Sequence, residues 1–176
     1  MRPALPLLVL IALAVVLFGA CSRGGAKTAT SIPTFATSET SDVPNPGNPG
    51  LRTTTLRYDG GSMTVEVADT PETRAEGLAD RDSLARDSGM LFDLGSAGTT
   101  SFWMKGMRFP LDMVWIDAEQ RIVGVTADVQ PQRGAPDSAL RLYPSPDSTR
   151  YVIELNAGVA GERGLAQGTQ LAFTVP

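Results

Sequence analysis

Histidine is absent from the 176 residues, and cysteine occurs once, at Cys21. Histidine is the commonest side chain for proton exchange and metal binding near neutral pH. Its absence, together with a single cysteine, excludes Ser-His-Asp and Cys-His catalysis and most zinc sites. Glycine-rich loops that hold phosphates or dinucleotides are missing as well. The sequence therefore predicts no metal and no cofactor, and it favours a non-enzymatic role while leaving catalysis by carboxylates open.

Basic residues are outnumbered, with 15 Lys+Arg against 19 Asp+Glu and a net charge of −4. Proteins that bind nucleic acids carry a basic stripe that neutralises phosphates. No such stripe is present, so we expect no nucleic-acid partner. Electrostatic attraction to anionic lipid is disfavoured for the same reason, and attachment to a membrane would need a covalent anchor.

Long hydrophobic runs are also lacking, and the longest lies at the N-terminus. After Arg2, an apolar run of about 12 residues ends at Phe18, whereas a membrane-spanning helix needs about 20. The stretch Leu17-Phe-Gly-Ala-Cys21 resembles the bacterial lipoprotein signal, in which the cysteine is diacylated and becomes the mature N-terminus. We expect residues 1–21 to be a lipoprotein signal peptide, with lipidated Cys21 holding the protein on the extracytoplasmic side of the cell membrane or the outer membrane.

Residues 22–50 are rich in Pro, Gly, Ser and Thr and show no hydrophobic periodicity. Such a segment cannot bury enough apolar surface to offset the entropy of ordering it. We expect a disordered tether that spans roughly 30 Å. Residues 51–176 have the usual size of one globular domain.

Within this domain, short alternating segments predict strands, and glycine-rich turns separate them. The predicted strands are 53–58, 63–68, 113–116, 121–126, 151–155 and 170–175. Thr70 followed by Pro71 predicts a helix from residue 71 to about residue 79. Short turns of helix are predicted from Asp82 to Gly89 and within residues 157–165. The pattern indicates a mainly β domain, a sandwich or partly closed barrel with one or two short helices.

Nine short motifs occur in a fixed order between about residue 62 and residue 175. They are Ala68-x-Thr70, Glu76-Gly-Leu78, Arg81-x-x-Leu84, Gly89-Met-Leu-Phe92, Phe102-Trp-Met-Lys105, Pro110-Leu-Asp112, Ile116-Asp117, Tyr143-Pro-Ser145 and Glu154-Leu-Asn-Ala-Gly158. Together they resemble domain-of-unknown-function family number 192, a bacterial and archaeal group often secreted or lipid-anchored. The resemblance implies a compact, mainly β, jelly-roll-like fold. Gly106-Met107 stands where many relatives carry Asn-Thr, and the family brings no established activity.

Aromatic bulk and charge are mixed most densely in residues 101–117, which hold both tryptophans. On an extended strand Trp103 and Lys105 share one side, while Phe102 and Met104 face the other, which suits core packing. We expect Trp103 and Lys105 to border a site. The candidate ligand-binding residues are Trp103, Lys105, Asp112, Glu154, Arg81 and Asn156, and the ligand would be a small polar molecule, a glycan or an envelope protein.

Three other roles stay open. An envelope hydrolase resembling a glycosidase would use Asp112 and Glu154 as its acid and base. A purely structural role in an envelope complex is the second. The third concerns Asp112 alone, whose carboxylate would accept hydrogen bonds from backbone amides and so stabilise a turn. A Ser101–Lys105 dyad and a calcium site formed by Asp112, Asp117 and Asp128 are disfavoured by their spacing.

Overall fold

The computed structural model describes residues 50–176; the predicted signal peptide, Cys21 and nearly all of the predicted tether lie outside the described residues. Eight strands and two short α-helices follow one another in the described part. They are β1 (Thr53–Tyr58), β2 (Gly61–Ala68), α1 (Pro71–Glu76), β3 (Ser88–Gly98), β4 (Ser101–Phe102), β5 (Leu111–Ile116), β6 (Ile122–Val129), β7 (Tyr143–Pro144), β8 (Thr149–Asn156) and α2 (Val159–Glu162), with a 3₁₀ turn at Asp137–Ala139. The predicted compact, mainly β fold with short helices is confirmed, and the sheets do not close into a barrel.

Six strands form one sheet in the order β1-β2-β3-β8-β5-β6, and β4 pairs with β7 in a separate two-stranded sheet. Only β2 and β3 run parallel, and α1 lies in the crossover between them. The strands β3, β8 and β5 therefore lie in the middle of the large sheet, where both faces can be covered. No helix among residues 50–176 combines the length and apolar character needed to cross a membrane.

Local sequence explains the first elements. Tyr58 pairs with Gly61, so Asp59 and Gly60 form the turn of the β1–β2 hairpin, and Gly60 has a φ of 94° that suits glycine. Helix α1 begins after Thr70, whose Oγ1 accepts the Thr73 amide at 3.2 Å. Proline in the first turn costs nothing there, because the amide it lacks would have no helical partner.

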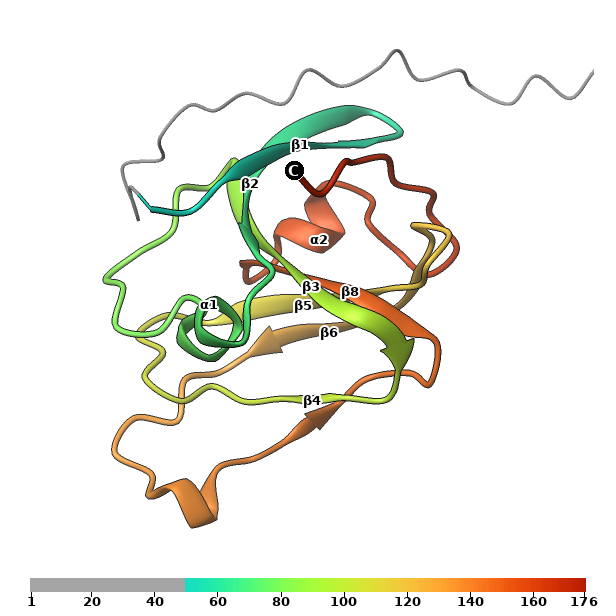
Figure 1. Ribbon diagram of the computed structural model, residues 1–176. Helices are drawn as coiled ribbons and strands as arrows, with labels where there is room; N and C mark the ends of the chain where they lie inside the picture. The colour runs from blue at the N-terminus through green and yellow to red at the C-terminus, as the bar shows by residue number, and fades with distance from the viewer. Residues whose placement is uncertain (1–49) are drawn as a thin grey trace, which may run out of the picture. The chain divides into compact units, whose positions relative to one another are not determined.

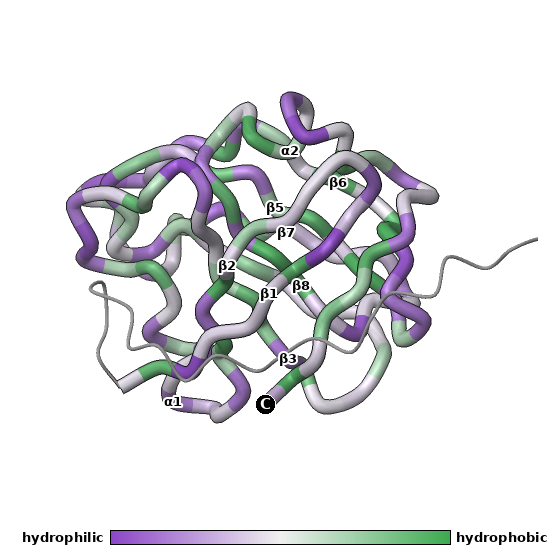
Figure 2. The backbone as a smooth tube through the Cα atoms, turned by 90° about the horizontal axis from the view of Figure 1, so that it is seen from above, coloured by the Kyte–Doolittle hydropathy of each residue, from purple (hydrophilic) through white to green (hydrophobic). Residues whose placement is uncertain are grey.

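Side chains from the two faces of the large sheet form two hydrophobic cores. The first core holds Val65, Val114 and Leu155 and includes Val159 of α2. The second core holds Met90, Phe92, Met113 and Val152 and includes Leu78, just after α1. Figure 1 shows α2 on one side of the β8–β5 region and β4 on the other, and Figure 2 shows hydrophobic positions along the central strands. The candidate site lies on the face of the second core.

The structure corrects three predicted elements. Strand β3 was not predicted, because Met90, Leu91 and Phe92 are all buried and the run shows no alternation. The predicted turn of helix from Asp82 to Gly89 is absent, and no helix is assigned there. The predicted strand 170–175 is reduced to two isolated bridges, from Gln170 to Arg121 and from Ala172 to Arg57. This C-terminal segment thus links β1 to the Arg121 end of β6.

Candidate functional site

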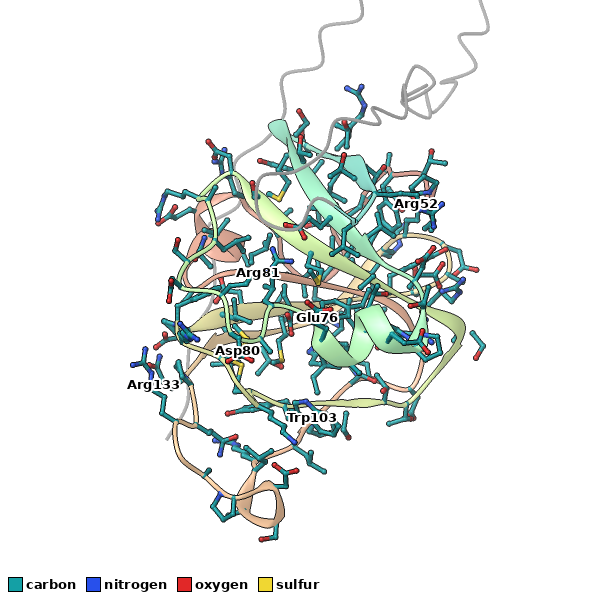
Figure 3. All side chains as sticks on the ribbon, turned by 60° about the vertical axis from the view of Figure 1, so that its left-hand side comes forward. Arg52, Glu76, Asp80, Arg81, Trp103 and Arg133 are labelled. Carbon is teal, nitrogen blue, oxygen red and sulfur yellow. The ribbon has the colours of Figure 1, made fainter. Side chains whose placement is uncertain are left out.

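A cavity of about 260 Å³ opens on the side of the second core. One wall comes from α1 and the turn that follows it, residues 74–79, and another from residues 100–107. Phe92 and Leu94 of β3 complete the apolar lining, and the side chain of Glu154 in β8 adds a carboxyl group. Figure 3 shows Trp103 on the segment below α1 and Glu76 on the helix itself. The cavity therefore lies between a short helix and a sheet face.

Strand register places two glutamates in one row on this face. Glu66 of β2 pairs with Met90 of β3, Met90 pairs with Glu154 of β8, and Glu154 pairs with Met113 of β5. Directly paired residues of neighbouring strands project to the same face of a sheet. The row therefore runs Glu66, Met90, Glu154, Met113 across the buried face, and each carboxyl group lies beside methionine.

Glu66 is neutralised by the protein itself. Its side chain is 1% exposed, and its two carboxylate oxygens each accept a bond of 2.7 Å from Arg81. The bond to Glu66 also raises the pKa of the Arg81 guanidinium above its ordinary value. A bidentate pair of this kind compensates a buried carboxylate well. Arg81 therefore serves Glu66 and does not line the cavity, contrary to its expected place in the site.

Glu154 has no comparable partner. It is 5% exposed, and no residue among those described donates a hydrogen bond to its carboxyl group. Burial, with no neighbouring charge to oppose it, raises the pKa of Glu154 from 4.5 to about 8. A lone carboxylate costs too much to keep ionised in an apolar site, so the group holds its proton at neutral pH. The carboxyl group at the cavity can therefore donate a hydrogen bond or, when a cation approaches, ionise.

Trp103 and Lys105 also line the cavity. The strand assumed for them is not present, because β4 ends at Phe102 and both residues lie beyond it. The Trp103 side chain is 49% exposed, which is unusual for so large an apolar group. The Lys105 ammonium is bonded to Asp137 at 2.6 Å. Ser101 lines the cavity too, but the lysine amine that a dyad would need is held by this acid.

The structure places Asp112 away from the cavity. Asp112 pairs with Leu155, so its side chain and that of Glu154 project from opposite faces of the sheet. Its Oδ1 accepts the Asp128 amide and its Oδ2 accepts the Ala160 amide, both at 2.9 Å. Asp112 thus joins β6 and the first turn of α2 to β5. Because Asp112 and Glu154 do not face one opening, they cannot flank the bond of one glycoside.

Asn156 is also structural. Its side-chain amide donates to the carbonyl groups of Leu84 at 3.0 Å and Ala85 at 3.3 Å. These bonds hold the irregular segment between α1 and β3. Among residues 50–176 no cluster of three or more Cys, Asp or Glu side chains is close enough to hold a metal ion.

Sequence reasoning missed the aromatic wall and one end of the cavity. Phe92 and Phe102 line it beside Trp103, and their rings meet edge to face with centroids 5.1 Å apart. Both residues were assigned to core packing, which is also true, because the cavity is an extension of the second core. Arg74 and Glu76 of α1 line the cavity but were not among the predicted site residues, because no motif or alternation in the sequence marked them.

A second hollow, of about 590 Å³, lies beyond Lys105 and is polar. Arg108 lines it and already pairs with Asp82 at 2.5 Å and with Asp80 at 3.6 Å. Figure 3 shows Arg133 on the outer loop that borders it. These are exposed ion pairs, which contribute little to folding stability.

The profile of the DUF192 family, described as "Uncharacterized ACR", matches residues 54–173. A crystal structure from Sinorhizobium meliloti 1021, described as a candidate transcription regulator, is 33% identical, with a TM-score of 0.60 over 69% of this chain and 92% of that chain. A protein of unknown function from Novosphingobium aromaticivorans DSM 12444 is 25% identical, with a TM-score of 0.63 over 85% of this chain and 99% of that chain. No curated protein matched significantly.

The raised pKa of Glu154 predicts a specific dependence of stability on pH. The unfolded carboxyl group ionises near 4.5, whereas the folded one holds its proton to about pH 8. Between these values the folded state binds the extra proton, so the free energy of unfolding falls as pH rises. In Glu154→Gln this contribution disappears. Urea unfolding should show the wild type losing on the order of a few kcal/mol relative to the variant across this window.

Glu119→Gln, at an exposed carboxyl group, is the matched control and should follow the wild type. Parallel curves for the wild type and Glu154→Gln would show that the Glu154 carboxyl group is not desolvated.

The contacts of Asp112 predict a structural and not a functional defect. Asp112→Asn leaves only one oxygen to accept one buried and one partly buried amide, so one N–H loses its partner. We expect unfolding to become easier by about 1–3 kcal/mol. Ligand binding at the cavity, measured in the folded variant, should be unchanged. Loss of binding without loss of stability would instead place Asp112 in the site.

Proposed function

The chain belongs to the DUF192 family of uncharacterised proteins, and we propose that its folded domain binds a small molecule in the cavity lined by Trp103 and Glu154. The observation that carries this proposal is Glu154, a buried carboxyl group without a partner among residues 50–176. Burying such a group lowers the stability of the fold, and a bound ligand would compensate this cost by pairing with the group. Binding sites are typically apolar hollows with a few polar groups. This cavity combines aromatic walls with one such group.

Binding is favoured over the open catalytic alternative. Glycoside hydrolysis by two carboxyl groups needs both of them at one cleft, and the register separates Asp112 from Glu154. Transcription regulation, the description given to the Sinorhizobium meliloti protein, is not adopted for this chain, since its net charge of −4 does not suit DNA. A ligand-binding domain with no turnover of its own is the simplest function that uses Glu154.

A screen of small molecules by NMR tests this proposal. The labelled full-length protein should show amide shift changes confined to the cavity, at positions such as Gly77, Leu94 and Thr100. Trp103→Ala should weaken binding by about tenfold, because a ring at a binding site contributes roughly 1–2 kcal/mol. The loss of a half-exposed side chain should leave the fold intact.

Leu142→Ala is the matched control, since Leu142 is 53% exposed and does not line the cavity. Shift changes that map elsewhere, or equal effects of the two alanine variants, would overturn the proposal.

We further propose that the domain acts from a membrane surface through a lipid on Cys21, outside the cytoplasm. The apolar run that ends at Phe18 and the small residues before Cys21 support this. Several acyl chains would give a durable anchor, whereas a single chain would not. Cells fed an alkyne fatty acid should incorporate the label into the wild type and not into Cys21→Ser. Equal labelling of both proteins, or of neither, would contradict the anchor.

A further inference from the structure

The aromatic lining of the cavity is concentrated next to Glu154. Phe92, Phe102 and Trp103 come from β3, from β4 and from the residue after it, and all three line the same hollow. Phe102 also meets Trp115 edge to face, with ring centroids 5.6 Å apart, so its orientation is fixed from behind. The faces of aromatic rings carry partial negative charge and attract cations.

Both cations that line the cavity are already occupied. Nη1 of Arg74 donates to the carbonyl oxygens of Asp69 and Asp93, each at 2.8 Å. The Lys105 ammonium donates to Asp137 at 2.6 Å. Neither cation is bonded to a carboxylate of the cavity, and an anionic ligand would have to compete with these bonds.

The Glu154 carboxyl group, in contrast, has no charged partner among residues 50–176, whereas Glu76 interacts electrostatically with Arg81 at the edge of the cavity. Glu154 lies within it, and Glu76 lines it from the exposed side of α1. Two strands away in the same row, the charge of Glu66 is already neutralised by Arg81. The charged groups that line the cavity together with Glu154 are Arg74 and Glu76 of α1 and Lys105 of the following segment, and no cation among residues 50–176 is bonded to Glu154.

We propose that the ligand is an organic ammonium ion, whose charged group pairs with Glu154 while its apolar part contacts Phe92, Phe102 and Trp103. This inference rests on the proposed function, since it names the ligand class of the same cavity. The ammonium group would give Glu154 the charged partner that residues 50–176 do not provide. An ion of this type would combine attraction to the ring faces with a desolvated charge pair.

The proton balance follows from this pairing. Without ligand the Glu154 carboxyl group is protonated at neutral pH, and only its ionised form attracts a cation. Binding of the ammonium ion therefore releases one proton to solvent. Affinity for a permanent cation should rise with pH and become constant above about pH 8. A neutral ligand that accepts a hydrogen bond from the protonated acid would show the opposite trend.

Choline and 3,3-dimethylbutan-1-ol form a matched pair of probes. They have the same shape, and a carbon atom in the alcohol replaces the charged nitrogen of choline, whose charge does not change with pH. Dissociation constants are measured by NMR titration of the folded domain from about pH 6 to about pH 9. Choline should bind at least about tenfold more tightly than the alcohol at the upper end. Its affinity should fall by about tenfold per pH unit below the Glu154 pKa.

Two variants assign the effect to a residue. Glu154→Gln should abolish the pH dependence and bring the two affinities close together, whereas Glu119→Gln, at an exposed carboxyl group outside the cavity, should retain the pH dependence. Equal binding of both probes, affinity that falls with rising pH, or no choline binding at any pH overturns the ammonium assignment. A cavity that prefers the neutral alcohol, or another molecule from the screen, would leave the proposed binding function standing and refute only this ligand class.

Discussion

Burial of two carboxyl groups on one face of the central sheet is the constraint from which the site follows. An ionised carboxylate in an apolar interior needs a cation or several donors. Glu66 receives a bidentate arginine, whereas Glu154, in the same row, receives nothing from residues 50–176. The sheet can hold Glu154 only as a neutral acid until an external partner arrives. The same residue type is thus paired at one position and has no partner among residues 50–176 two strands away.

Strand register assigns the acids their roles. Asp112 and Glu154 lie on neighbouring strands, yet Asp112 pairs with Leu155 and not with Glu154, which puts them on opposite faces. On its own face Asp112 finds two amides, one from β6 and one from α2, and becomes a connector of three elements. A shift of one residue between β5 and β8 would exchange the two faces. Such a shift would expose the buried apolar side chains on both faces, so the packing that stabilises the fold also keeps the two acids apart.

Local sequence patterns predicted many of the strands, but they could not predict which strands pair. Alternation located both hairpins and β8, and it placed Trp103 and Lys105 together although neither lies in a strand. The central strand β3 escaped detection because burial on both faces removes alternation. The separation of Asp112 from Glu154, and the engagement of Arg81 and Asn156 elsewhere, depend on which strands become neighbours. A short window of sequence does not show which strands become neighbours. The candidates were chosen by residue type, and the predicted site therefore combined residues from opposite faces of the sheet.

Residues that line the cavity are fixed by hydrogen bonds and ring contacts to neighbouring elements. Arg74 ties α1 both to the end of β2 and to β3 through the carbonyl oxygens of Asp69 and Asp93. The Phe102 ring meets the rings of Phe92 and Trp115 edge to face, so the back of the aromatic wall is already packed. Binding to a prearranged site costs little ordering entropy. For the proposed ammonium ligand, the main cost would then be the ionisation of Glu154, which the positive charge of the ligand would offset, so that its affinity would depend on the protonation state of the acid.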